Sequence, residues 1–300
     1  MRLAVKIAIK SILQQIFIVP LALLYYKIKL QSKKCCNIVV CSHIGDFIFT
    51  MGYVKTLKQE KQIEMIRVIS TERMRPIATL YNESNFEFKA ISAKWLHVLE
   101  IADRYNCGKQ AFRCIKNNYF VVPANWFTLG IDGATRNKNN NLKECVKSYC
   151  LDIHTENGFE APVTERSNSN KLNKVLLCMD AESITWNECE VYEKKLLESL
   201  TEEGYEIEIN GKDSFYSLDK FITVCDTFCA IIGVRSGILD LAAFSSAKIV
   251  ALYPSESEKY IHFYDICKTN ENKKNVIQIV LGSDIENDIK IILDYIRKDW

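Results

Sequence analysis

The stretch that most constrains the fold runs from Phe228 to Pro254 and reads FCAIIGVRSGILDLAAFSSAKIVALYP. Two short, largely apolar runs, Ala230–Val234 and Lys248–Tyr253, have the composition of buried strands. Between them, residues 236–244 place apolar side chains at helical spacing, which predicts a strand, a helix and a second strand. Such a crossover joins parallel strands and is right-handed in almost all proteins. We therefore expect an α/β fold with a parallel sheet.

The turn inside this stretch, Gly233-Val234-Arg235-Ser236-Gly237, has the residue types of a phosphate site. Ligands of parallel sheets bind at the carboxyl ends of the strands, where this turn is expected. Helix N-terminal N–H groups, the Ser236 hydroxyl and the Arg235 guanidinium all suit a diphosphate. On the plainer interpretation Ser236 is an N-cap, Gly237 a turn residue and Arg235 a surface charge. Our hypothesis is a diphosphate site that uses Gly233, Arg235, Ser236 and Gly237.

A second strand-to-helix turn occurs near the start of the chain. Asn37–Cys41 is an apolar run, Ser-His-Ile-Gly-Asp follows at 42–46, and residues 47–59 have helical spacing. Asp46 is placed to act as a general base that takes a proton from an attacking hydroxyl. His43 is a second candidate acid or base. The alternative for Asp46 is helix capping, since Asp is a favoured cap in any protein.

The two turns together resemble the GT-B glycosyltransferases, and among them the heptosyltransferases of glycosyltransferase family nine. In that family a small-residue "G-D" loop follows the first strand, and its Asp, here Asp46, is the proposed base. The helix Leu239–Ala243 resembles an "HLAA"-like helix of the family, with Asp240 in place of the family's His. The resemblance implies two Rossmann-like domains facing a cleft, metal-independent and inverting transfer, and a nucleotide-diphospho-sugar donor with no cofactor. The replacement of His by Asp240 indicates a relative with a different sugar, or one from a capsule or other cell-surface polysaccharide pathway.

The rest of the chain fits a two-domain plan. Strand-like and helix-like segments alternate, and a polar segment that includes Pro162 interrupts them. We expect an N-terminal segment at 1–34, an acceptor domain at 35–160, a linker at 161–174 and a nucleotide-sugar domain at 175–300.

Two pairs of loop residues complete the predicted site. Asn125 and Trp126 follow an expected strand at 119–123 and could contact an acceptor sugar, although Trp126 is equally suited to the core. The resemblance implies that the loop after the expected strand Lys174–Met179 helps to hold the donor's phosphates. Ser183, with Thr185 behind it, is the candidate there.

The N-terminal segment is basic and apolar. Residues 1–34 hold seven Lys and Arg and no acidic residue, beside the apolar run Ile16–Tyr26. This run is shorter than the ~20 residues of a spanning helix, and no cleavage site of a signal peptide follows it. The pattern favours a helix on the inner face of the cell membrane, in a cytoplasmic protein. The alternative is a helix packed on the first domain.

Composition excludes other classes. The 300 residues carry a net charge of +2 and show no basic patch interleaved with aromatic residues, so we expect no nucleic-acid partner. Twelve cysteines without a CxxC pair indicate reduced thiols and no metal site. The sequence thus predicts a hexosyl- or heptosyltransferase that acts on a saccharide or lipid-linked saccharide in cell-surface polysaccharide synthesis. Two alternatives stay open, a nucleotide-sugar epimerase of similar build and a non-catalytic polysaccharide-assembly protein.

Overall fold

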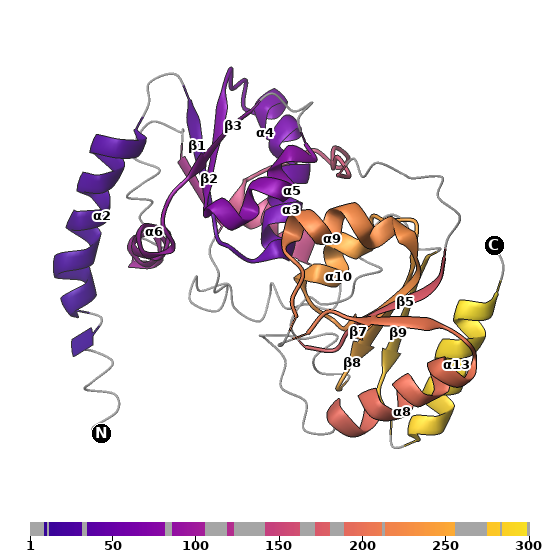
Figure 1. The fold of residues 1–300 in the computed structure, drawn as a ribbon. Coiled ribbons are helices and arrows are strands. Elements are labelled where there is room, and N and C mark those ends of the chain that lie inside the picture. The colour runs from indigo at the N-terminus through magenta and orange to yellow at the C-terminus, as the bar shows by residue number, and fades with distance from the viewer. Residues whose placement is uncertain are drawn as a thin grey trace. The chain divides into compact units, whose positions relative to one another are not determined.

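The chain forms two compact units in the computed structural model (Figure 1). Unit 1 comprises Met1–Thr135 and Lys143–Ala161, and unit 2 comprises Arg136–Leu142 and Pro162–Trp300. The structure describes residues 9–10, 12–31, 35–81, 86–105, 119–122, 142–162, 172–180, 189–211, 214–255, 275–282 and 284–298. The change of unit after Ala161 falls at the start of the predicted linker, and residues 163–171 of that linker lie outside the described part.

Unit 1 is built on a parallel sheet with the strand order β3-β2-β1-β4. The strands are β1 (Cys36–Val40), β2 (Ile66–Ser70), β3 (Phe86–Ala90) and β4 (Tyr119–Val122). The helices are α3 (Ile44–Gly52), α4 (Val54–Glu60), η3 (Glu72–Met74), α5 (Arg75–Thr79), α6 (Ala93–Tyr105), α7 (Leu142–Cys145) and η6 (Val146–Cys150). Helices α3, α4 and α5 lie on one side of the sheet and α6 on the other (Figure 1). Every residue of β1 is buried, which is why its sequence is a short apolar run rather than an alternating one.

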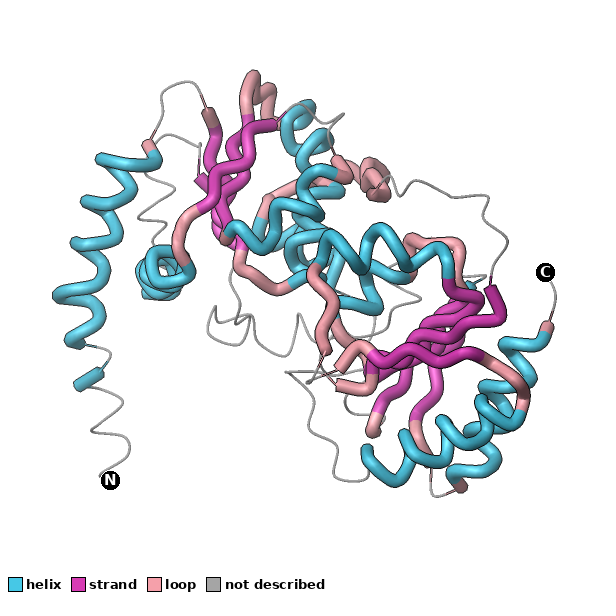
Figure 2. Tube along the Cα trace, viewed as in Figure 1, coloured by secondary structure: helices cyan, strands magenta, loops and turns pink. Residues whose placement is uncertain are grey.

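Unit 2 contains a second parallel sheet with the order β6-β5-β7-β8-β9. The strands are β5 (Leu172–Cys178), β6 (Glu206–Ile209), β7 (Phe228–Val234), β8 (Lys248–Tyr253) and β9 (Val276–Val280). Helices α8 (Cys189–Glu202) and α13 (Ile285–Arg297) cover one side, and α9 (Leu218–Val224) and α10 (Gly237–Ala242) the other, with η7 (Cys225–Thr227) after α9 (Figures 1 and 2). The predicted α/β fold with helices on both sides of parallel sheets is confirmed.

The described residues of the N-terminal segment are helical up to Leu30 and pack within unit 1. It consists of η1 (Gln14–Ile18), α2 (Val19–Tyr25) and η2 (Tyr26–Leu30), of which the first and third are π-helical. One face is buried through Ala22, Tyr26 and Leu30, which belong to the same apolar cluster as residues of α6 and of β1, β2 and β4. Among the described residues, no helix is both long and apolar enough to cross a bilayer.

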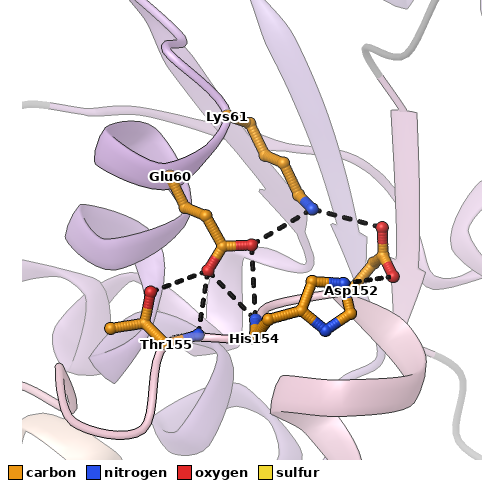
Figure 3. Close-up of polar contacts among 5 residues, drawn as sticks. All are labelled: Glu60, Lys61, Asp152, His154 and Thr155. Carbon is orange, nitrogen blue, oxygen red and sulfur yellow. Dashed lines mark hydrogen bonds and ion pairs between the residues drawn. The ribbon is translucent and has the colours of Figure 1, made fainter.

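A polar network ties the last segment of unit 1 to the end of α4 (Figure 3). The Glu60 carboxylate accepts hydrogen bonds from the backbone N–H groups of His154 and Thr155 and from the Thr155 hydroxyl, at 2.8 to 3.3 Å. Lys61 Nζ lies 3.2 Å from both Glu60 Oε1 and Asp152 Oδ2. Burial acts to raise the pKa of Glu60, but the hydrogen bonds from Thr155, His154 and Lys61 together lower this pKa to about 2.

We expect Glu60→Gln to destabilise unit 1 because a neutral amide accepts these hydrogen bonds less well. Hydrogen bonds to a charged group contribute about 1.5–3 kcal/mol, and partial exposure of Glu60 reduces the expected loss to about 1 kcal/mol. A lowered carboxyl pKa stabilises the folded state at pH values above the ordinary pKa of 4.5. The difference in free energy of unfolding between wild type and variant should therefore shrink as the pH falls from 4.5 to about 2. Urea unfolding with Glu64→Gln as the exposed control measures this. A difference in free energy of unfolding that stays constant over this pH range would contradict the lowered pKa of Glu60.

Candidate active site

The carboxyl end of β1 places Asp46 and His43 in unit 1. The sheet order reverses between β1 and β4, whose paired residues include Val40 and Val122. Ligands of open parallel sheets bind outside the strand ends at such a reversal. Helix α3 begins at Ile44, directly after β1 and a three-residue loop, and Asp46 is its third residue. The main chain therefore brings Asp46 to the position in this sheet where a ligand is expected.

Three side chains converge at this position. The buried Cys41 thiol donates to Asp46 Oδ2 over 3.5 Å, and His43 Nδ1 lies 3.5 Å from the same oxygen. The side chain of Asp46 is 7% exposed and that of His43 is 59% exposed. One oxygen of the carboxylate is thus contacted by a buried thiol and by an exposed imidazole. Sequence analysis missed Cys41 because it was assigned to the strand core.

The chemistry of Cys41 is set by its surroundings. Burial and then the negative charge of Asp46 raise the pKa of the Cys41 thiol well above its ordinary value. The thiol is therefore protonated near neutral pH and acts as a hydrogen-bond donor rather than as a nucleophile. Its contact restrains one oxygen of Asp46.

The structure also bears on the alternative that Asp46 is only a helix cap. The N-cap of α3 is His43, with extended backbone dihedrals of φ −85° and ψ 129°. Asp46 lies inside the first turn, where a carboxylate interacts favourably with the helix dipole. Asp46 is therefore not the N-cap residue, and its role as a base stays a prediction.

Cys41, His43 and Asp46 are also a combination that could ligate a metal ion. Their ligand atoms lie within 4.8 Å of one another, and thiolate, imidazole and carboxylate are all ligands of Zn²⁺ in proteins. No metal site was predicted from the sequence. Three ligands would leave the fourth tetrahedral position of the metal open. Cys41 binds a metal only as a thiolate, and its raised pKa opposes loss of the thiol proton.

In unit 2, the reversal of strand order lies between β5 and β7. Cys178, the last residue of β5, pairs with Gly233 of β7. A Cβ atom at Gly233 would lie 2.2 Å from the carbonyl oxygen of Cys178, so only glycine fits there. Gly233 is thus a strand residue, as the predicted strand Ala230–Val234 implies, and it is not part of the turn to which it was also assigned. The turn proper is Arg235 and Ser236, and α10 begins at Gly237.

Arg235 is buried rather than presented to solvent. Its side chain is 1% exposed, its Nη2 lies 2.5 Å from Asp240 Oδ1, and its Nη1 donates to the carbonyl of Ser236 at 2.8 Å. The predicted open guanidinium at the strand end is therefore not what the structure contains. The pairing also gives a physical reason for Asp240 at the position of the family's His, because a buried Arg needs an anion.

Ser236 precedes α10 as its N-cap, and its side chain makes no capping hydrogen bond. The alternative interpretation of Ser236 as an N-cap is therefore correct for its backbone but not for its hydroxyl. The first N–H groups of any helix lack partners within that helix. The Ser236 hydroxyl and the N–H groups at the start of α10 thus lie at a helix N-terminus, as predicted. Phosphate binding by these groups stays a prediction.

Four predicted site residues, Asn125, Trp126, Ser183 and Thr185, lie outside the described part of the chain. The strands that precede them in the sequence, β4 and β5, are described. Strand β4, before Asn125, pairs with β1, and strand β5, before Ser183, pairs with β7.

Asn210, which is not among the predicted site residues, is buried and directly follows β6. Its Oδ1 accepts from the Tyr216 N–H at 2.7 Å and its Nδ2 lies 3.7 Å from Cys178 Sγ. Asn210 fixes the loop beside the carboxyl end of β5. A buried asparagine directly after a strand was the signal that could have identified it.

Comparisons place this architecture among known folds. The sequence matches no protein-family model and no curated protein. Among solved structures, the chain is similar to the ADP-heptose lipopolysaccharide heptosyltransferase II of Escherichia coli, with a TM-score of 0.54 and 14% identity over 87% of this chain and 98% of that one. It is similar to E. coli heptosyltransferase WaaC, solved with ADP, with a TM-score of 0.55 and 12% identity over 86% and 99% of the two chains.

Two further structures agree. A glycosyltransferase family 9 protein from Veillonella parvula aligns with a TM-score of 0.51 and 14% identity over 86% of this chain and 90% of that one. The iron-containing dodecameric glycosyltransferase TibC from enterotoxigenic E. coli aligns with a TM-score of 0.53 and 12% identity over 78% of this chain, which spans 62% of that protein. The predicted resemblance is confirmed at the level of structure, and this chain has the two-sheet GT-B fold of the heptosyltransferases.

Proposed function

We propose that this protein is a glycosyltransferase that transfers a sugar from a nucleotide-diphospho-sugar to a hydroxyl of a saccharide acceptor. The observation that carries the proposal is the position of Asp46. A largely buried carboxylate, restrained by Cys41 and adjoined by His43, lies where the first sheet reverses its strand order. The fold similarity to heptosyltransferases supports the reaction class, since a fold alone hosts many chemistries.

In the proposed mechanism, Asp46 accepts the proton of the acceptor hydroxyl. The hydroxyl oxygen forms a bond to the anomeric carbon while the bond from that carbon to the diphosphate oxygen breaks. The electron pair leaves with the nucleoside diphosphate, and attack on the face opposite the leaving group inverts the anomeric configuration. His43, exposed and 3.5 Å from Asp46, is available to accept a hydrogen bond from the acceptor or to pass the proton to water.

We assign the donor to the carboxyl ends of β5 and β7 in unit 2. The hydroxyl of Ser236 and the N–H groups at the start of α10 would contact the diphosphate, together with Ser183 and Thr185. Arg235 would support this site indirectly. Its hydrogen bond to the Ser236 carbonyl restrains the turn that carries the Ser236 hydroxyl. WaaC was solved with ADP and TibC with ADP-D-β-D-heptose, so an adenosine diphosphate is the first nucleotide to test.

We further propose that transfer needs no metal, because the sequence has no DxD motif at a strand end and the charge of the leaving diphosphate can be offset by protein donors. The setting that best fits the basic and apolar N-terminal segment is the cytoplasmic face of the cell membrane. A saccharide or lipid-linked saccharide of a cell-surface polysaccharide would be the acceptor there. The kind of sugar transferred, hexosyl or heptosyl, follows from the donor that binds.

The donor assignment is tested by thermal unfolding with ADP, UDP, GDP and CDP, each beside its nucleoside. We expect one diphosphate, at 100-fold over its dissociation constant, to raise the free energy of unfolding by about 2.7 kcal/mol. Its nucleoside should do much less. Ser236→Ala should weaken that diphosphate about tenfold or more, because a hydrogen bond to a charged group contributes about 1.5–3 kcal/mol.

Ser199→Ala, on α8, is the matched control and should bind as wild type. Absence of stabilisation by every diphosphate would contradict the donor assignment and favour the non-catalytic alternative. Binding accompanied by conversion of the free nucleotide-sugar to its epimer would favour the epimerase.

A further inference from the structure

The N-terminal helix, described at residues 9–10 and 12–30, has a second apolar face that the rest of the described chain leaves exposed. Eight large apolar side chains between residues 9 and 28 are exposed, by 46% to 66% each. They are Ile9, Ile12, Leu13, Ile16, Phe17, Leu21, Leu24 and Ile28, and we call them the outer stripe. They recur at steps of three or four residues, or as adjacent pairs, which places them along one side of a helix. Contiguous exposed apolar surface of this kind marks an interaction site.

The opposite face of the same helix is firmly attached to unit 1. The rings of Tyr25 and Trp95 stack with their centroids 3.9 Å apart. Asn37 Nδ2 donates to the Tyr26 hydroxyl at 2.9 Å and to the Leu30 carbonyl at 3.1 Å. Both packing on unit 1 and an exposed apolar surface therefore occur in one helix, and the stripe is held in a fixed direction relative to the sheet of unit 1.

The charges beside the outer stripe have one sign. Lys10, Lys27 and Lys29 are exposed on this helix, and residues 1–34 contain no acidic side chain. An apolar face with basic flanks matches the surface of an anionic bilayer, where the apolar groups enter the headgroup boundary and the lysines face the phosphates. A second copy of the chain fits less well, because it would bring these basic flanks close together.

The length of the stripe indicates how it would lie. From Ile9 to Ile28 a helix rises by about 28 Å at 1.5 Å per residue, while the exposed side chains occupy only one side of it. We propose that the outer stripe lies flat in the surface of an anionic membrane and orients unit 1 on it. The binding itself does not depend on the proposed function. The benefit of this binding does rest on the proposed function, because a transferase held at the membrane surface has to find a lipid-linked acceptor only within that surface.

The test is flotation of the full-length chain with vesicles of phosphatidylcholine, with and without phosphatidylglycerol, at low salt. Wild type should float with the anionic vesicles and should be released at high salt, because screening weakens attraction to the lipid phosphates. The double variant Phe17→Asp with Leu24→Asp should lower the vesicle-bound fraction at least tenfold. Each substitution removes an apolar side chain that would be buried in the membrane when the protein is bound. Both positions are exposed, so the fold measured by circular dichroism should not change.

The matched control is Val191→Asp with Phe215→Asp, two exposed apolar residues of unit 2, which should float as wild type does. Lys27→Glu with Lys29→Glu leaves the stripe intact and should abolish the preference for anionic vesicles. Equal flotation of wild type and the Phe17 and Leu24 variant would overturn the proposal. A wild-type protein that does not float with anionic vesicles would also overturn it. If light scattering shows a dimer that those substitutions disperse, the occupant of the outer stripe is a second copy of the chain. Nucleotide binding, measured in parallel, is independent of all these outcomes.

Discussion

Replacing Asp240 by Ala should lower the free energy of unfolding by about 3–5 kcal/mol, a large part of the stability of a domain. Asp240 Oδ1 and Arg235 Nη2 lie 2.5 Å apart, and both side chains are 1% exposed. Removing the carboxylate leaves a guanidinium without its anion in the core of unit 2. Arginine does not lose its proton at accessible pH, so the charge cannot be neutralised. Chemical unfolding followed by circular dichroism measures the loss.

Two variants separate the ion pair from the general effect of truncation. Asp219→Ala removes an exposed carboxylate from the first turn of α9 and should change stability by less than about 0.5 kcal/mol. Arg235→Met combined with Asp240→Leu removes both charges and should recover most of the loss, because a buried ion pair is often replaceable by apolar groups. A cost below about 1 kcal/mol for Asp240→Ala would show that this pair is not buried in solution.

The strands and helices were predictable because local signals agreed with the tertiary structure. Residues 248–253 form strand β8 as predicted, since buried parallel strands are continuous apolar runs. Helix α13 has an equally local signal at its start, where the Asp284 side chain accepts a hydrogen bond from the Asn287 N–H at 3.1 Å. Here the cap and the apolar periodicity both act within a few residues of chain.

The predictions that needed correction concern the direction of side chains. The sequence around Arg235 is equally compatible with an open phosphate ligand and with a buried partner of Asp240, because position along the chain does not determine burial. Gly233 was assigned to the turn, although its selection depends on a carbonyl from β5, more than fifty residues earlier in the chain. Cys41 looked like a core residue, and only the folded loop brings its thiol to Asp46.

The N-terminal helix shows the same limit in another form. Membrane contact and packing on the first domain were treated as alternatives, yet one face packs through Ala22, Tyr26 and Leu30 while the other remains exposed. A helix with apolar residues on two sides has no single hydrophobic direction. The sequence therefore cannot show which side faces unit 1, whereas the packing against Trp95 does.

The central claim is that Asp46 is the general base of sugar transfer. Asp46→Asn keeps the size of the side chain and removes only its ability to take a proton. Loss of general-base catalysis typically lowers the rate by about 10²–10⁴-fold. Binding of the donor, which we assign to unit 2, should not change. Glu72→Gln, a carboxylate in the first turn of the helical segment after β2, is the matched control and should keep wild-type turnover.

The most direct measurement is therefore turnover of the donor identified by thermal unfolding, followed as release of the nucleoside diphosphate, for wild type, Asp46→Asn and Glu72→Gln. A chelator is present throughout, so that no metal at Cys41, His43 and Asp46 contributes, and donor affinity is measured on the same samples. We predict that donor affinity is unchanged and that turnover falls at least a hundredfold in Asp46→Asn alone. Near-normal turnover of Asp46→Asn would contradict it and leave Asp46 a structural residue of α3.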